Sequence, residues 1–390
     1  MCNQKRLHGL KKRGARRRAA AGFLAAVCLC TAGAFPLPAH AAGPSVSAQA
    51  AVLMNASDGT LLWEKNGEEK LPMASTTKIM TALLTLETAS LDDRAVDITD
   101  AMVRVEGSSM GLHAGDRVTL SALAKGMLSV SGNDAANAAA YALDGSPQAF
   151  AAHMNRRAEE LGLRNTHFVT PSGLDDDAHY TTASDLAKLA RAAMQNPAFA
   201  AITAQRTIKI PYLSPDVSYT FTNHNKLLAQ YQGCIGVKTG FTKKAGRCLV
   251  SCAERDGVRL IAVTLHAPDD WNDHKAMLDY GFGRLHGVQL DDSSFVQELP
   301  VVGAAQNTVS VQGGKGPSVV LPVDTVLQRE VELPRFLYAP LEEGSVVGRV
   351  VYRAGGAVVG ETALVASAVA RQPVPEKNLW EKIADFFQRK

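Results

Sequence analysis

The sequence is poor in cysteine, shows no internal repeat, and has no cluster of histidine, cysteine and aspartate with the spacing of a zinc site. Six cysteines in 390 residues are too few for a disulfide-rich scaffold, and we expect neither a metal nor another cofactor. Hydrophobic residues make up 46% of the chain and charged residues 20%, as in ordinary soluble globular proteins. This composition excludes a disordered chain, a collagen-like chain and a polytopic membrane protein.

Acidic residues are absent from the first 41 positions, which contain eight lysines and arginines. The rest of the chain therefore holds 33 of the 41 basic residues against all 38 acidic residues, a net charge of −5. A mildly acidic body argues against nucleic acid as the main partner.

The same N-terminal stretch has the pattern of a secretion signal. A basic run ends at Arg18, an apolar stretch covers residues 19–34, and the small-residue motif Ala39-His40-Ala41 follows. We therefore predict that residues 1–41 form a signal peptide, cleaved before Ala42, and that the protein is exported. An uncleaved membrane anchor is the alternative interpretation.

The remaining chain divides into two regions that differ in their pattern of predicted helices and strands. Strand-like and helical patterns alternate over residues 42–285, which predicts one α/β (α+β) domain. We expect a helix over residues 75–90 and a helical block over residues 119–163 and 183–204. From residue 286 to residue 372 helical patterns vanish and short strands with turn signals follow, which predicts a small all-β domain. Further strands of the first domain are expected at Thr207–Tyr212, Cys234–Thr239, Cys248–Cys252 and Leu260–Leu265.

Three cysteines lie beyond the signal: Cys234, Cys248 and Cys252. An odd number leaves at least one without an intramolecular partner, and we expect them to act mainly as small buried side chains in strands. If the strands form a hairpin, Cys252 falls opposite Ile235 or Gly236. A Cys234–Cys252 bridge is then the only plausible internal disulfide.

Ser75 and Lys78 form the first of three short motifs that together suggest a serine hydrolase. At the start of a helix, residues three apart share a face, so Lys78 lies beside Ser75. A serine needs an adjacent base to become a useful nucleophile, and a neutral lysine can serve. The unpaired N–H groups of the first turn also favour developing negative charge. By itself, however, a Ser-x-x-Lys pattern is expected by chance about once in such a chain.

Two further motifs follow in order. Ser131-Gly132-Asn133 begins 56 residues after Ser75, and Lys238-Thr239-Gly240 begins 107 residues after Ser131. The first offers a hydroxyl that can pass a proton and an amide that can hold a substrate backbone. The second offers a cation and a hydroxyl for a carboxylate, and Gly240 permits close approach of a substrate. Each alone is equally consistent with a turn, but the order of all three indicates a penicillin-interacting serine hydrolase.

With these motifs, the chain resembles the serine-type D-Ala-D-Ala carboxypeptidases among the low-molecular-mass penicillin-binding proteins. The resemblance covers nearly the whole mature chain and includes Pro171-Ser172-Gly173-Leu174 and Thr182-Ala183-Ser184-Asp185-Leu186. It implies the penicillin-binding, serine β-lactamase-like fold with a helical subdomain, followed by an all-β domain and an amphipathic helix. It also implies removal of the terminal D-alanine from peptidoglycan pentapeptides, with β-lactams as inhibitors.

The resemblance assigns a role to each motif residue. Ser75 would attack the carbonyl between the two D-alanines to form an acyl-enzyme, Lys78 would take its proton, and Ser131 would relay a proton. Asn133 would orient the acyl chain. The resemblance also implies that Lys238 and Thr239 bind the terminal carboxylate, with His224 nearby and Gly240 beside the substrate. The backbone N–H groups of Ser75 and Phe241 would form the oxyanion hole.

Other functions are compatible with parts of this pattern. A serine β-lactamase shares the three motifs but needs a deacylating glutamate on a loop, whereas Glu159 and Glu160 lie in a continuous helical pattern. A non-catalytic wall-binding or penicillin-sensing protein could use the same fold. Endopeptidase activity on peptide cross-links would use the same site as carboxypeptidase activity.

The last segment, residues 373–390, reads as a linker followed by an amphipathic helix. About 15 residues are too few to span a bilayer, which needs about 20, but they suit a helix lying in the membrane interface. We therefore expect it to hold the exported protein on the outer face of the cytoplasmic membrane. A helix packed on the β-domain or on a partner is the alternative. The apolar stripe consists of Leu379, Trp380, Ile383, Phe386 and Phe387.

Overall fold

The computed structural model describes residues 43–372 and Trp380. The predicted signal peptide and nearly all of the predicted C-terminal helix lie outside the described residues. Within the described part of the chain, no helix is long and apolar enough to cross a membrane.

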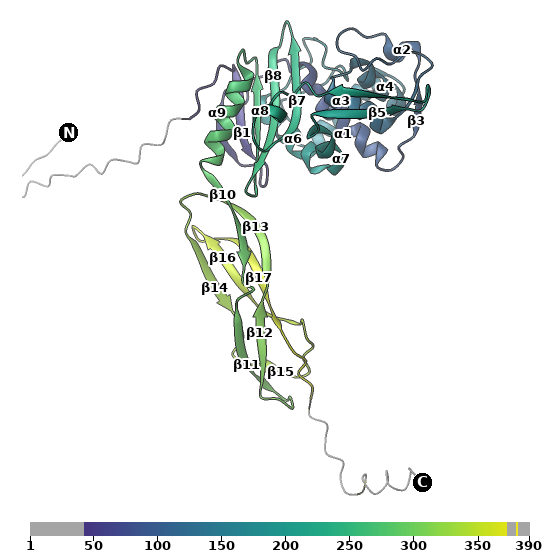
Figure 1. The fold of residues 1–390 in the computed structure, drawn as a ribbon. Helices are drawn as coiled ribbons and strands as arrows, with labels where there is room; N and C mark the ends of the chain where they lie inside the picture. The colour runs from purple at the N-terminus through teal and green to yellow at the C-terminus, as the bar shows by residue number, and fades with distance from the viewer. Residues whose placement is uncertain (1–42, 373–379, 381–390) are drawn as a thin grey trace, which may run out of the picture. The chain divides into compact units, whose positions relative to one another are not determined.

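Five antiparallel strands form the main sheet of the N-terminal part, in the order β2-β1-β9-β8-β7 (Figure 1). All four strand segments predicted between residues 207 and 265 are confirmed, since they lie in β5, β7, β8 and β9. The strands of the sheet are β1 (Ala50–Asn55), β2 (Leu61–Lys65), β7 (Cys234–Thr242), β8 (Gly246–Arg255) and β9 (Val258–Leu265).

This sheet is buried on both faces because its central strands alternate between two cores. In β1, Val52 and Met54 enter one core, whereas Ala51 and Leu53 enter the other. The strand therefore reads as an unbroken apolar run, as expected where both faces are covered. Figure 1 shows α9 and α6 on opposite sides of the sheet, and both helices contact its strands.

Helices and two short pairs of antiparallel strands make up the rest of this domain. β3 (Ala95–Asp97) pairs with β4 (Arg117–Thr119), which follows a short helix in the chain, and β5 (Thr207–Tyr212) forms a hairpin with β6 (Val217–Thr222). The helices are α1 (Lys78–Ala89), α2 (Asp100–Val103), α3 (Leu120–Ser129), α4 (Asn133–Asp144), α5 (Pro147–Glu160), α6 (Ala183–Gln195), α7 (Pro197–Thr203), α8 (Leu227–Gln230) and α9 (Asp270–Phe282).

The helix predicted over residues 75–90 is divided in the structure. Residues Ala74–Thr77 form a 3-10 turn, and the α-helix begins only at Lys78. The hydroxyls of Thr76 and Thr77 donate hydrogen bonds to the carbonyls of Met73 and Ala74, three residues back, which tightens this turn. Periodicity alone predicts a helix here but not its tighter first turn.

The C-terminal part is an all-β domain with its own core, as predicted. Its strands β10 (Leu285–Asp291) and β13 (Lys315–Pro322) pair with each other. A six-stranded sheet has the order β14-β16-β17-β12-β11-β15. Its strands are β11 (Val296–Val302), β12 (Thr308–Gly313), β14 (Leu327–Glu332), β15 (Leu337–Tyr338), β16 (Val346–Ala354) and β17 (Ala357–Ala366).

Asp292 is the polar centre of this β-domain. Its buried carboxylate accepts hydrogen bonds from Arg329 Nε at 2.8 Å, from the Tyr352 hydroxyl at 2.9 Å and from the Thr362 hydroxyl. Burial opposes ionisation, but these three donors outweigh it and lower the pKa of the carboxyl group. The carboxylate therefore stays charged and links β14, β16 and β17 at one point.

The cysteines of the described chain are free, and two of them are fully buried in β8. Cys252 lies opposite Gly236, as predicted, and Cys234 lies opposite Ala253. The Cys234–Cys252 bridge is therefore absent from the structure. Burial also raises the pKa of both β8 thiols.

We predict three free thiols in the protein lacking residues 1–41, counted with a thiol reagent in denaturant. Without denaturant Cys234 should react fastest of the three, because it is partly exposed whereas Cys248 and Cys252 are shielded by the core. Burial raises the pKa of the Cys234 thiol as well, so it should react more slowly than a free cysteine. A count of one under denaturing conditions would mean that a disulfide forms.

Candidate active site

Ser75 and Lys78 meet at the junction of the 3-10 turn and α1. The Lys78 Nζ lies 2.9 Å from the Ser75 Oγ. In a 3-10 turn, side chains three residues apart are eclipsed, so this tight turn holds the lysine directly beside the serine. The first site pair predicted from the sequence is therefore brought together.

Lys78 has no access to solvent and three polar neighbours. Besides Ser75, its Nζ donates to the Asn133 Oδ1 at 2.6 Å and to the Ser172 backbone carbonyl at 2.7 Å. Burial lowers the pKa of Lys78 well below its ordinary value, and the nearby Lys238 lowers it further. A neutral amine has two hydrogens and one lone pair. It can therefore donate to Asn133 and Ser172 while its lone pair faces the Ser75 hydroxyl.

Ser131 and Lys238 form a second hydroxyl–amine pair in the same site. The Lys238 Nζ lies 3.0 Å from the Ser131 Oγ and 2.7 Å from the Thr239 carbonyl. Ser131 has a φ of 63°, an unusual conformation for a serine, which turns the chain sharply between α3 and α4. Burial lowers the pKa of Lys238 to about 7, so this lysine can also change its charge near neutral pH.

Asn133 begins α4, and both polar atoms of its amide are hydrogen-bonded in the structure. Its Oδ1 accepts from Lys78, and its Nδ2 donates to the Glu106 carbonyl at 2.6 Å. The side chain therefore orients the lysine from a buried position beneath the cleft.

Asp134 is a site residue to which the sequence pattern assigns no role. Its buried carboxylate accepts from the backbone N–H groups of Met110 and Leu112 at 3.0 Å each and from the Ser109 hydroxyl at 2.6 Å. It thereby fixes the segment containing Ser108, which lines the cleft. An aspartate after an N-terminal asparagine of a helix is a weak signal, because acidic residues are common in first helical turns.

Two glycines permit the close packing that forms the site. A Cβ added to Gly240 on β7 would lie 3.1 Å from the backbone nitrogens of Ser75 and Thr76. A Cβ added to Gly173 would lie 1.9 Å from the Ala74 carbonyl oxygen, and Gly173 has a φ of 83°. The strand and the loop therefore press directly on the turn that contains the nucleophile.

The 170–181 loop is tied both to the nucleophile helix and to the β7–β8 turn. His179 Nδ1 accepts from the Val169 N–H, so its Nε2–H faces the Thr77 hydroxyl at 2.7 Å. On the other side, Thr242 donates to Asp175 at 2.7 Å and Lys244 pairs with Asp177. Burial lowers the pKa of His179 to about 4, consistent with a neutral structural histidine.

A cleft of about 320 Å³ opens above these groups. All the predicted site residues lie at it or directly beneath it: Lys78, Asn133 and Lys238 are buried below, and the others line it. The lining residues are Ser75, Ser108, Ser131, His224, Lys226, Thr239, Gly240, Phe241, Arg247, Asp270 and Trp271.

His224 occupies an exposed position on the rim of the cleft. Its backbone N–H donates to the Ser129 carbonyl at 3.1 Å, which anchors it next to the second motif. Partial burial and the charge of Lys238 lower the pKa of its imidazole. His224 therefore lies at the cleft, and its surroundings favour the neutral imidazole more than those of a free histidine do.

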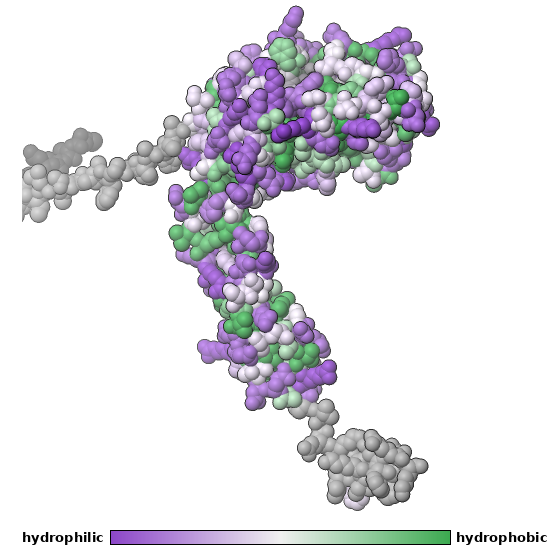
Figure 2. All heavy atoms as spheres, in the orientation of Figure 1, coloured by the Kyte–Doolittle hydropathy of each residue, from purple (hydrophilic) through white to green (hydrophobic). Residues whose placement is uncertain are grey.

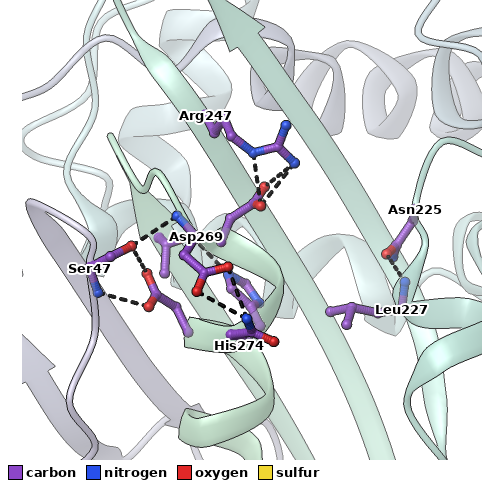
Figure 3. A network of polar contacts seen from close by, with 10 residues as sticks. Ser47, Asn225, Leu227, Arg247, Asp269 and His274 are labelled. Atoms are coloured by element: carbon purple, nitrogen blue, oxygen red, sulfur yellow. Dashed lines mark hydrogen bonds and ion pairs between the residues drawn. The ribbon is translucent and has the colours of Figure 1, made fainter.

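Arg247, Asp270 and Trp271 form a wall of the cleft that sequence reasoning missed. Figure 3 shows the Arg247 guanidinium paired with a carboxylate; its Nε and Nη2 donate to Asp270 at 2.9 and 3.0 Å. The guanidinium also lies 5.5 Å from the centre of the Trp271 ring. These residues are 23 and 24 positions apart in the sequence, and only the pairing of β8 with the start of α9 brings them together.

The start of α9 is itself fixed by the segment before β1. Ser47 Oγ accepts from the Asp269 N–H at 3.0 Å, and Ser47 donates its own N–H and hydroxyl to Asp273 at 2.8 Å each (Figure 3). Asp270 is thereby held in place to receive Arg247.

Comparisons with known proteins identify two families that match successive parts of the chain. The model of the D-alanyl-D-alanine carboxypeptidase family matches residues 38–269, and that of the penicillin-binding protein 5 C-terminal domain matches residues 290–371. D-alanyl-D-alanine carboxypeptidase DacC of Escherichia coli is 32% identical over 370 residues, which cover 89% of each chain. DacF of Bacillus subtilis is 32% identical over 82% of this chain and 85% of its own. The crystal structure of DacD from Francisella tularensis aligns with a TM-score of 0.61 and 28% identity, over 85% of this chain and 95% of the other.

We predict that the rate at which benzylpenicillin acylates Ser75 rises with pH through an apparent pKa well below that of a free lysine. Lys78 must be neutral to accept the serine proton, and its pKa is lowered by burial and by Lys238. The rate should be followed by stopped-flow over about pH 5 to 10. Lys209→Gln, at an exposed position on β5, is the control and should keep the profile. A rate that does not change over this range would argue against Lys78 as the base.

Proposed function

The chain belongs to the D-alanyl-D-alanine carboxypeptidase family, and from this membership we propose how the residues of its cleft share the reaction. The protein is a serine D-Ala-D-Ala carboxypeptidase, a hydrolase of the peptidase type. A β-lactamase is not favoured, since Glu159 and Glu160 lie exposed at the end of α5. A non-catalytic binding protein is not favoured either, since every side chain that the reaction needs lies in the cleft or is hydrogen-bonded directly beneath it.

We propose that acylation begins with attack of the Ser75 Oγ on the carbonyl carbon between the two D-alanines. The Lys78 Nζ, 2.9 Å away, takes the hydroxyl proton as the new C–O bond forms. The negative charge that develops on the carbonyl oxygen is stabilised by the N–H groups of Ser75 and Phe241. The close approach of Gly240 to the Ser75 nitrogen supports this arrangement of donors.

The second half of acylation expels the terminal D-alanine. Its nitrogen must gain a proton as the C–N bond breaks, and the Ser131 hydroxyl, backed by the Lys238 ammonium at 3.0 Å, is placed to pass it. Transfer of the proton from Lys78 to the leaving amine through Ser131 restores the neutral Lys78 amine. Water then attacks the acyl-enzyme, Lys78 takes a proton from the water, and it returns that proton to the Ser75 Oγ as the ester bond breaks and the shortened peptide leaves as a carboxylic acid.

The substrate's terminal carboxylate fits the polar end of the cleft. Thr239 offers a hydroxyl there, and Lys238 offers positive charge from below. Arg247 and the rim residue His224 line the same cleft, and we propose that they add to the recognition of the carboxylate. β-Lactams would acylate Ser75 in the same position.

The observation that carries this proposal is the environment of Lys78. It is a fully buried amine with two acceptors for its hydrogens and the Ser75 hydroxyl at its remaining position. A buried lysine of purely structural purpose would normally pair with a carboxylate, and this one does not.

Ser75→Ala should abolish both release of D-alanine from an acylated Lys-D-Ala-D-Ala peptide and covalent labelling with a fluorescent penicillin, because both need the same acyl-enzyme. The matched control is Ser90→Ala, which changes an exposed serine just beyond the other end of the same helix. It should keep both activities. Labelling that survives Ser75→Ala would identify a different nucleophile and overturn the assignment.

We propose that the chain is exported and works at the outer face of the cytoplasmic membrane on peptidoglycan stem peptides. Support comes from the sequence pattern of residues 1–41, from the family's activity, and from the apolar stripe in residues 373–390. We also retain as proposals the boundaries of 42–285 for the catalytic domain and 286–372 for the β-domain.

Truncation after Pro375 should move the protein lacking residues 1–41 from the membrane pellet to the soluble fraction, with D-alanine release unchanged. The lost segment carries four cations against three acids, so binding should depend on its apolar face and resist salt. Flotation of the full and truncated chains with vesicles at low and high salt tests this. A truncated chain that still floats would contradict the anchor.

A further inference from the structure

One end of the β-domain, which we call the tip, exposes aromatic side chains next to arginines. The tip consists of Val302 at the end of β11, Arg335 and Phe336 before β15, Tyr338 in β15, and Arg371 near the end of the described chain. All five are exposed.

Backbone hydrogen bonds bring these separate segments together. β15 pairs in parallel with β11, so Tyr338 lies beside Val302. The Ala305 N–H donates to the Arg371 carbonyl at 3.0 Å, and the Ala339 N–H donates to the Val302 carbonyl at 3.0 Å. The turn after β11, the strand β15 and the last described residues therefore form one surface, and Figure 1 shows β15 at the end of the domain from which the described chain leaves.

The two aromatic rings of the tip point toward solvent, whereas the leucine between them in the sequence points into the core. Phe336 is 43% exposed and Tyr338 is 67% exposed, whereas Leu337 between them is 7% exposed and belongs to the core. The two rings meet edge to face, with 5.2 Å between their centres. Val302, which is 50% exposed, adds aliphatic surface beside Tyr338. The leucine is therefore buried in the β-domain core, and the aromatic pair remains exposed and available to contact another surface.

The charge of the tip has one sign. Segments 302–307, 334–341 and 367–372 contain Arg335 and Arg371 and no acidic residue. Glu342 and Glu343 follow directly and reduce the net attraction to an anionic surface. Elsewhere the β-domain surface is mixed, with purple hydrophilic and green hydrophobic areas interspersed (Figure 2).

We propose that the tip lies on the membrane surface, with Phe336, Tyr338 and Val302 in the interface and the two arginines at the level of the lipid phosphates. Exposed aromatic rings beside arginines are the chemistry that interfacial lipid selects. The inference deepens the membrane location proposed above and rests on it. The position supports it, because Arg371 is one residue before the end of the continuously described chain. Eighteen residues then follow, among them the apolar stripe, so a membrane that binds this stripe comes within reach of the tip.

The test compares vesicle binding of four versions of the chain from Ala42: unchanged, Phe336→Ser/Tyr338→Ser, Val326→Ser/Val358→Ser, and truncated after Pro375. Val326 and Val358 are exposed apolar residues near the opposite end of the six-stranded sheet and serve as the matched control. The vesicles contain phosphatidylethanolamine and phosphatidylglycerol. We expect the tip variant to bind about tenfold more weakly than the unchanged chain, since two partly inserted rings are lost, and the control to bind unchanged.

A second measurement does not depend on weakened binding. Tyr338→Trp is placed in the full chain, and its fluorescence is compared with that of the unchanged chain on vesicles with brominated acyl chains. We expect additional quenching from the new tryptophan. Val326→Trp should add emission that the brominated lipid does not quench.

The outcomes distinguish the proposal of a C-terminal anchor from the proposal that the tip contacts the membrane. If truncation fails to release the protein, the C-terminal anchor is wrong whatever the tip does. If truncation releases it but the tip variant binds like the unchanged chain and the Tyr338→Trp variant shows no additional quenching, the tip proposal is overturned and the anchor stands. Occupation of the tip by a second copy would appear as a dimer in sedimentation equilibrium that the tip variant dissolves, and this too would overturn the proposal.

Discussion

Burial of the Lys78 amine is the constraint on which the rest of the active site depends. An ammonium group without solvent is costly by several kcal/mol unless its hydrogens are well placed, so the lysine gives up its proton readily. The structure supplies two acceptors from different elements, the Asn133 side chain on α4 and the Ser172 carbonyl in the 170–181 loop. Once these are in place, the one remaining direction of the amine is toward Ser75. Nucleophile activation is therefore a result of packing more than of any single ion pair.

The two-sided sheet makes that packing stiff. The edge strand β7 is paired along its length with β8, whose side chains enter both cores, and this pairing holds Gly240 close to the backbone nitrogen of Ser75. On the helical side of the site, the buried Asp134 carboxylate restrains the segment that contains Ser108 in a similar way. The site is thus prearranged before a substrate arrives, as stabilisation of a developing oxyanion requires.

Much of the fold and of the active site could be predicted from the sequence. The features that could not be predicted share identifiable physical reasons. Alternating and apolar patterns located the strands, and three motifs located Ser75, Ser131 and Lys238, because local periodicity and short spacings are recorded directly in a sequence. The 3-10 turn was missed because periodicity does not register the threonine hydroxyls that tighten it. The Arg247–Asp270–Trp271 wall and the tip of the β-domain were missed because their members are distant in the chain and meet only through strand pairing and helix placement.

The 170–181 loop has a consequence for how susceptibility to inhibitors can change. It contacts the nucleophile turn and helix through Thr77 and Lys78 and the β7–β8 turn through Thr242 and Lys244, so it connects the element that carries Ser75 with the strand that carries the third motif. None of its residues belongs to the three motifs. A lineage under antibiotic selection could therefore retune the fit of bulky drugs, while keeping the small natural dipeptide, by exchanging residues in this loop and leaving every motif intact. Surveillance confined to motif residues would overlook such variants.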